Sequence, residues 1–145
     1  LVRQFDARYA NADTLDFQTG NVEQDGFELI LECTGNDRVM MQSAQLLAGC
    51  GIMVWLGASR LPQVREFDVN QIMRNAILGN HLYLGTVNNA PQDMQSAIDH
   101  LYQLKSQYGE AIASMITNKV APADSLWHYT NREPQGVKTV VCYDR

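Results

Sequence analysis

The chain has 145 residues, of which 46% are hydrophobic and 19% charged, and its formal net charge is −5 at pH 7. This length suits one domain that can bury a core, and the composition is ordinary for a soluble globular protein. The charges form no acidic or basic runs, and no apolar stretch approaches membrane-spanning length, so neither a nucleic-acid surface nor a membrane partner is expected.

The cysteines and histidines are scattered along the chain. The three cysteines stand at positions 33, 50 and 142 and the three histidines at 81, 100 and 128, with no Cys-x-x-Cys pair and no ligand spacing between them. This pattern predicts neither a disulfide framework nor a zinc site. We therefore expect structural thiols in a reducing, cytoplasmic setting.

The first ten residues are typical of a helix end that leads into a short strand at 7–10, and residues 11–26 of a polar loop or short helix. A strand is predicted over 27–33, because this mostly apolar run stops at the turn Thr34-Gly35. Asp37 can cap a helix over 39–47, with Gly49 and Gly51 as its stop.

Residues 52–56 are the next buried strand, which ends at a Gly57-Ala58-Ser59 turn. Two apolar strands joined by one amphipathic helix predict a parallel βαβ unit. Ligands of such sheets bind beyond the carboxyl ends of the strands. The turns after the two strands are therefore the first candidate positions for a site.

The rest of the chain continues the alternation of helix and strand. Asp68 is expected to cap a helix over 69–78, a third strand follows over 81–87, and the longest helix begins at Pro91 with an apolar face. Residues 109–115 can form a separate turn of helix. A strand over 116–121, a short helix over 123–130 and a β-branched strand over 137–142 complete the pattern.

Several short motifs in this order resemble the C-terminal half of the medium-chain, zinc-dependent alcohol dehydrogenases, and most closely their glucose dehydrogenase branch. The motifs are Leu31-Glu32-Cys33-Thr34-Gly35, Gly49-Cys50-Gly51, Trp55-Leu56-Gly57-Ala58-Ser59, Asn80-His81-Leu82-Tyr83-Leu84-Gly85-Thr86-Val87-Asn88, Met115-Ile116-Thr117 and Gly136-Val137-Lys138. Each motif alone is weak, but their order and spacing cover almost the whole chain.

The resemblance implies an α/β fold, namely the second half of a doubly wound, Rossmann-type parallel sheet. Residues 1–114 would form the C-terminal portion of the NAD(P)-binding domain, and 115–145 a segment that returns toward a catalytic domain. The sequence holds no G-x-G-x-x-G turn and no Cys/His/Glu set for catalytic zinc. Because the family carries those parts upstream, the resemblance implies that this chain holds no catalytic or metal-binding residues and is inactive alone.

The resemblance also implies contacts to a nicotinamide cofactor at three strand ends. Thr34 would border the cofactor ribose, although a plain glycine turn explains the same residues. The second segment would pass the nicotinamide, where a glycine lets the backbone approach and its carbonyl and amide groups can bond the carboxamide. Asn88 would hold cofactor and substrate hydroxyl together, and its alternative role is to cap the next helix. The complete set is Thr34, Leu56, Gly57, Ala58, Thr86, Val87 and Asn88.

Two functions of different classes are compatible with the sequence. In the first, the chain orients NAD(P) in a dehydrogenase that oxidises a sugar such as glucose at a zinc-polarised hydroxyl. In the second, it is a small non-catalytic binding or oligomerisation domain. In either case strand 81–87 lacks Pro, Lys and Glu, so it is an unprotected edge that predicts a homo-oligomer.

Overall fold

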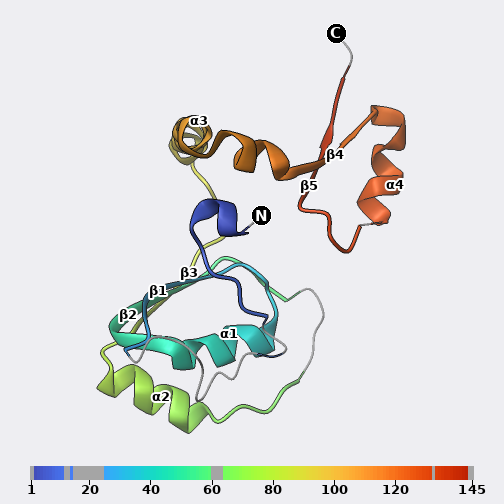
Figure 1. The fold of residues 1–145 in the computed structure, drawn as a ribbon. Helices are drawn as coiled ribbons and strands as arrows, with labels where there is room; N and C mark the ends of the chain where they lie inside the picture. Colours follow the sequence, from blue (N-terminus) through green and yellow to red (C-terminus); the bar gives the residue numbers. More distant parts are fainter. Residues whose placement is uncertain (1, 12–13, 15–24, 60–63, 132, 144–145) are drawn as a thin grey trace. The chain divides into compact units, whose positions relative to one another are not determined.

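The computed structural model describes residues 2–11, 14, 25–59, 64–131 and 133–143, and it divides into two compact units (Figure 1). One unit comprises residues 10–88, and the other comprises residues 1–9 together with 89–145. The boundary expected near residue 114 falls inside the second unit. The return of 115–145 toward a catalytic domain stays a prediction.

The unit of residues 10–88 is built on a three-stranded sheet in the order β1-β2-β3. Its strands are β1 (Phe27–Glu32), β2 (Leu47–Trp55) and β3 (Leu82–Gly85), and both pairs are parallel. The register aligns Leu29 with Ile52 and Ile52 with Leu82. The parallel α/β arrangement predicted from the sequence is therefore confirmed.

The connection from β1 to β2 differs from the prediction. Helix α1 (Asp37–Ser43) and the short 3-10 helix η2 (Ala44–Leu46) already end where β2 begins. The glycines expected to stop the helix lie inside β2, where the register shifts between Phe27 and Leu29. Cys50 has φ +60° there, and its amide donates to the carbonyl of Gly79 at 2.7 Å. Gly49 and Gly51 therefore belong to a β-bulge in β2 and do not stop the helix.

The structure confirms the helix cap predicted at Asp68 but not the one predicted at Asp37. Asn36 caps α1 in place of Asp37, because its side chain accepts from the amides of Arg38 and Val39. Helix α2 (Val69–Leu78) begins and ends as predicted, and the Asp68 carboxylate accepts from the Gln71 amide at 2.9 Å. A side-chain oxygen just before the first turn accepts a hydrogen bond from a backbone amide that has no carbonyl partner within the helix.

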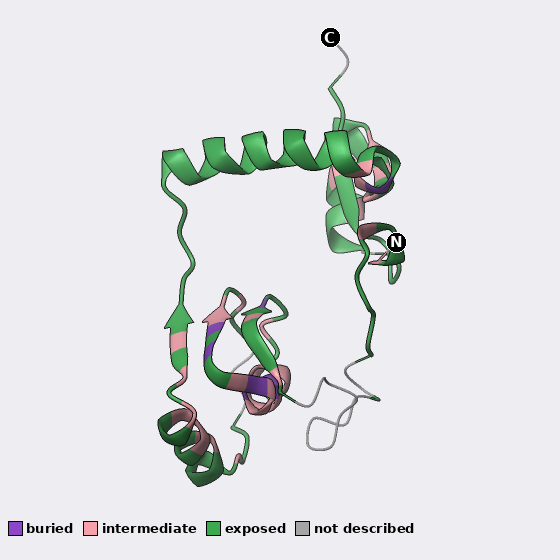
Figure 2. Ribbon diagram, turned by 60° about the vertical axis from the view of Figure 1, so that its left-hand side comes forward, coloured by how far each residue is buried: buried purple, intermediate pink, exposed green. Residues whose placement is uncertain are grey.

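The core of this unit lies on one face of the sheet. Met53 is fully buried beside Ala44 and Leu47, and Ile30, Trp55 and Tyr83 pack around them. Figure 2 shows this burial along β2 and at the end of α1. The opposite face carries the alternate residues of the same strands, and its large apolar side chains are exposed, namely Leu29, Leu31, Ile52, Leu82 and Leu84.

The second unit contains the longest helix, α3 (Pro91–Ser114), whose apolar face is exposed in this chain. Tyr108 departs from helical geometry, so the turn expected from residue 109 onward is set apart by a kink. The predicted C-terminal elements are present as β4 (Ile116–Val120), η3 (Pro122–Asp124), α4 (Ser125–Thr130) and β5 (Lys138–Val141), with β4 and β5 parallel.

The N-terminal expectation is partly wrong. A 3-10 helix, η1 (Val2–Phe5), opens the chain, and the ring of Phe5 lies 5.3 Å from that of Tyr108. Residues 7–10 form no strand. Most of the loop or short helix predicted over 11–26 lies outside the described residues. No described helix has both the length and the apolarity needed to cross a membrane.

Candidate functional site

The three segments predicted as cofactor contacts follow three neighbouring strands at the same edge of the sheet (Figure 1). The register pairs Glu32 with Trp55 and Trp55 with Gly85, so β1, β2 and β3 end level with one another. Thr34, Leu56 and Thr86 each come one or two residues later. The tertiary structure thus brings the sequence-predicted residues to one edge, the usual ligand side of a parallel sheet.

The first two segments are in direct contact through two glycines. A Cβ atom on Gly57 would lie 2.3 Å from the backbone nitrogen of Gly35. Gly35 has φ +63°, and a Cβ there would lie 2.7 Å from the carbonyl oxygen of Ala58. Neither position leaves room for a side chain. The glycine at 57 was expected to make room for a cofactor, and in this structure the adjacent turn fills that space.

Glu32 joins the same two segments, a role that none of the sequence motifs predicts. Its side chain is only 4% exposed, and one carboxylate oxygen accepts from the Thr34 amide at 2.7 Å and from the Thr34 hydroxyl. Its backbone carbonyl accepts from the amides of Leu56 and Gly57 at 2.8 and 3.2 Å. The available signal in the sequence is a second glutamate at the end of the strand, shortly before a Thr-Gly turn.

These hydrogen bonds limit how a nicotinamide can be held. A backbone amide has one hydrogen to donate, and those of Leu56 and Gly57 already point to Glu32. A carboxamide beside this segment would therefore pair with its carbonyl oxygens or with other amides.

The third segment is the most exposed of the three. The Thr86 amide donates to the Trp55 carbonyl at 3.1 Å, which holds the segment beside the end of β2. Val87 is 85% exposed, and Asn88 is exposed as well. The alternative role of Asn88 as a helix cap is wrong, because α3 is capped at Ala90, whose amide donates to the Asp93 carboxylate at 2.8 Å.

The described residues do not fit a zinc ion. Within the part of the chain that the structure describes, no three His, Cys, Asp or Glu side chains come close enough to bind a metal. The cysteines at 33, 50 and 142 are exposed, free thiols. No step of a reaction is therefore assigned to zinc on the residues of this chain.

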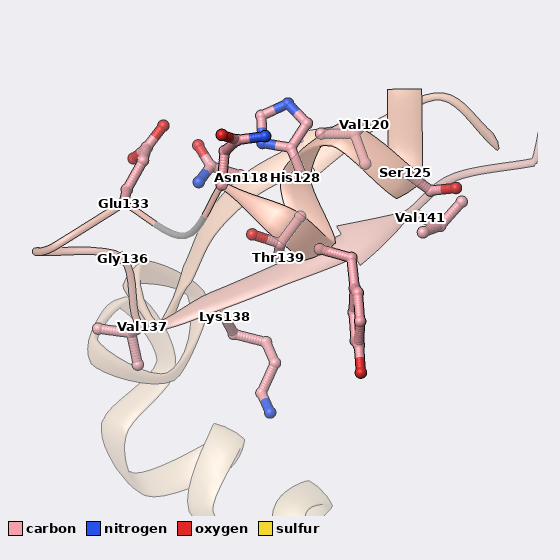
Figure 3. Close-up of a pocket in the computed structure, with 12 residues that line it drawn as sticks. Asn118, Val120, Ser125, His128, Glu133, Gly136, Val137, Lys138, Thr139 and Val141 are labelled. Carbon is pink, nitrogen blue, oxygen red and sulfur yellow. The ribbon is translucent and has the colours of Figure 1, made fainter. Parts of the chain in front are cut away.

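A hollow of about 380 Å³ lies in the other unit, between α4 and the β4–β5 pair (Figure 3). It includes polar side chains such as Asn118 and His128, but Lys138 points away from His128. Most of its lining is exposed, and none of the predicted cofactor contacts belongs to it. The strand ends of the unit of residues 10–88 therefore remain the better candidate site, since the register brings the three predicted segments together at the usual ligand side of a parallel sheet.

Among the described residues, one titratable group has a clearly shifted pKa. Burial raises the pKa of the Tyr83 phenol above its usual value of 10.0, because the charged form loses hydration. The Tyr83 ring lies 5.5 Å from that of Trp55, and its hydroxyl is 3.4 Å from Nδ1 of His81. Tyr83 therefore stays neutral at physiological pH and acts here as a packing group.

Solved structures share this fold. The glucose dehydrogenase of Haloferax mediterranei, in a structure described as a complex with NADP, Zn and gluconolactone, superposes over 99% of this chain and 39% of its own, with a TM-score of 0.83 and 21% identity. Benzyl alcohol dehydrogenase from Acinetobacter calcoaceticus superposes over 80% of this chain and 31% of its own, with a TM-score of 0.61 and 23% identity. At such identities the likeness concerns the fold.

Sequence relatives point to one branch of these proteins. Glucose 1-dehydrogenase 1 of Caldivirga maquilingensis is 27% identical over 79% of this chain and 32% of its own length. Glucose 1-dehydrogenase of Thermoproteus tenax is 29% identical over 68% of this chain and 28% of its own length. The chain thus spans about a third of the length of the curated relatives that it matches. The family model for the glucose dehydrogenase C-terminus matches residues 1–143, and the chain accordingly belongs to that family.

Proposed function

We propose that this chain is the cofactor-orienting part of an NAD(P)-dependent dehydrogenase that oxidises a sugar such as glucose. The observation that carries the proposal is the meeting of the three predicted cofactor-contact segments at the carboxyl edge of one parallel sheet, in a chain of the glucose dehydrogenase C-terminus family. The names of the relatives and the NADP described in the Haloferax structure support the same substrate and cofactor class.

Each segment has one part in this proposal. Thr34 would border the ribose, the Leu56-Gly57-Ala58 segment would contact the nicotinamide, and the exposed amide of Asn88 would pair with the cofactor and the substrate hydroxyl. A bound nicotinamide would supply the hydride acceptor, and this chain would supply orientation rather than acid–base chemistry. The proposal assigns the pyrophosphate-binding turn and the zinc ligands to other parts of that dehydrogenase, outside these 145 residues, and we call the proposed complete dehydrogenase the longer protein.

The first experiment compares this 145-residue chain with the longer protein. The chain alone is expected to show no dehydrogenase activity and to bind NAD or NADP far more weakly than micromolar, because it lacks the glycine-rich turn and helix N-terminus that hold a pyrophosphate. Isothermal titration calorimetry measures both cofactors. Micromolar affinity of the chain alone would contradict the proposal that cofactor binding needs a pyrophosphate-binding turn outside this chain.

The second experiment tests whether Asn88 belongs to the binding site. In the longer protein, Asn88→Ala should weaken cofactor or substrate binding about tenfold, the loss of roughly one hydrogen bond, with little effect on stability. Asn89→Ala is the matched control, because Asn89 is an exposed neighbour whose amide contacts only the Met94 sulfur, at 3.9 Å, among its described hydrogen bonds. Equal affinities for the two variants would rule out the role of Asn88.

The proposal includes self-association through the strand region 81–87. β3 is an edge strand of the described sheet, and the Thr86 amide points to β2. Amides alternate in direction along a strand, so those of Tyr83 and Gly85 point to the open edge. Two copies pairing there would satisfy these groups by two-fold symmetry.

Proline substitutions test this contact in solution. Tyr83→Pro and Gly85→Pro each remove an outward amide without removing a bond to β2, and Tyr83→Phe keeps both the amide and the ring. Sedimentation should show the proline variants dissociating and Tyr83→Phe remaining associated. Proline variants that stay folded and equally associated would end the edge-pairing proposal.

The alternative function, a non-catalytic binding or oligomerisation domain, is favoured by the exposed apolar face around Leu29, Ile52 and Leu82. In this alternative the chain works as it stands, and neither the chain nor a protein that contains it would reduce NAD or NADP with a sugar. A coupled spectrophotometric assay with glucose distinguishes the two functions. In both, the scattered free thiols support the reducing, cytoplasmic setting that we propose.

A further inference from the structure

We infer that Glu32 is a positioning residue that fixes two of the three cofactor-contact segments in their relative places. The inference rests on the proposed function, since it concerns the same strand ends. Glu32 is the last residue of β1, and its side chain and its backbone are bonded to different segments. Nothing in its position requires contact with a ligand.

The burial of the Glu32 carboxylate makes the following turn obligatory. Removing a carboxylate from water is expensive unless hydrogen bonds replace its hydration. At Glu32 the replacements come from the Thr34 amide at 2.7 Å, the Thr34 hydroxyl and the Gly35 amide at 3.4 Å. These donors converge only if the chain turns back at once, with Gly35 in its positive φ. The charge thereby selects the conformation of the first segment.

The backbone of Glu32 holds the second segment. Its carbonyl accepts from both Leu56 and Gly57, which brings Gly57 against Gly35. The position of the Thr34-Gly35 turn and the path of residues 56–58 are therefore coupled through one residue. A displacement of the turn would be transmitted to the second segment, because the two glycines leave no free space between them.

The side chain of Glu32 lies on the face of β1 that packs against the core. Ile30, two residues earlier on the same face of β1, packs against the core around Met53. Glu32 is 4% exposed, whereas Glu28, on the same strand, is exposed. The Glu32 side chain itself is thus withdrawn from solvent and reaches the site through Thr34, and the exposed Glu28 makes Glu28→Gln a matched control for Glu32→Gln.

Amide hydrogen exchange in the 145-residue chain tests the positioning directly. Glu32→Gln keeps the shape but replaces one acceptor oxygen with a donor group and removes the charge. The Thr34 and Gly35 amides should exchange about 10- to 100-fold faster, the factor that corresponds to hydrogen bonds to a charged group. The Cys50 amide, bonded to Gly79 at the other end of β2, should not change, and Glu28→Gln should leave all three as they are.

Two outcomes of this experiment overturn the inference. Equal acceleration at Cys50 would show that Glu32 only adds global stability, and unchanged exchange at Thr34 and Gly35 would show that the carboxylate does not order the turn. Should Glu32→Gln fail to fold, Thr34→Val removes the hydroxyl donor at nearly constant volume. Faster exchange at Gly35 is then expected, with Thr34→Ser restoring the slow rate.

Kinetics of the longer protein separate this inference from the function on which it rests. Glu32→Gln should raise KM for NAD or NADP about 10- to 100-fold with a smaller change in kcat, because the orienting surface is misplaced while the reacting groups remain. A wild-type protein without sugar-dependent activity would refute the proposed function and leave the exchange result to judge Glu32. An active protein with unchanged KM in Glu32→Gln would refute the positioning role.

Discussion

The contact between Gly57 and Gly35 gives the sharpest test of how the candidate site is built. In Gly57→Ala the new methyl group would start 2.3 Å from the Gly35 nitrogen and 2.7 Å from its Cα. Both neighbours are backbone atoms, so relief requires a shift of about 1 Å in one of the two segments. Overpacking of this kind costs about 3 kcal/mol at the upper end of its usual range.

Two smaller effects nearly cancel. The shift would weaken the bond from the Gly57 amide to the Glu32 carbonyl, which is worth about 1 kcal/mol. Alanine also restricts the unfolded chain and returns about 0.4–1 kcal/mol. We therefore expect Gly57→Ala to lower the free energy of unfolding by about 3 kcal/mol.

Gly85→Ala is the matched control at the end of the neighbouring strand. No heavy atom lies within 4 Å of a Cβ built at Gly85. Its unfolding free energy should stay within about 0.5 kcal/mol of the wild type, as for an ordinary surface substitution. Urea unfolding followed by Trp55 fluorescence, in a Trp127→Phe background, measures the unit that contains both glycines. The reasoning is refuted if Gly57→Ala is as stable as Gly85→Ala.

Three further predictions concern the same unit. Met53→Ala should lower the unfolding free energy by about 2–5 kcal/mol, because Met53 is fully buried, whereas Met73→Ala, at a 58% exposed position, should cost far less in the same urea titration. Asp68→Ala should cost about 1 kcal/mol through the lost cap of α2 and Asp68→Asn almost nothing, and helix content by circular dichroism during thermal unfolding checks the difference. The Tyr83 pKa lies above 10.0, so its stabilising contribution is complete below pH 10.0 and is lost as the pH rises through the higher folded-state pKa. Ultraviolet titration of wild type against Tyr83→Phe should show Tyr83 ionising above that value, and a midpoint at or below it would be inconsistent with its burial.

The sequence by itself determined the order and type of the main elements in the unit of residues 10–88. The apolar runs that became β1 and β3 and the Asp68-capped helix depend on local patterning, which is written directly in neighbouring residues. Parallel pairing also followed, because a crossover helix between two apolar strands leaves little alternative. The family motifs then pointed to the strand ends that the register brings level.

Only the tertiary structure decided the features that depend on contacts between distant residues. The bulge at Cys50 replaced an expected helix stop, because a glycine pair permits either conformation and the pairing with β1 selects one. Gly57 proved to face Gly35 rather than an open space, and Glu32 proved to join two turns. A charged residue at a strand end is ambiguous in the sequence, since its role depends on donors that folding alone brings within reach.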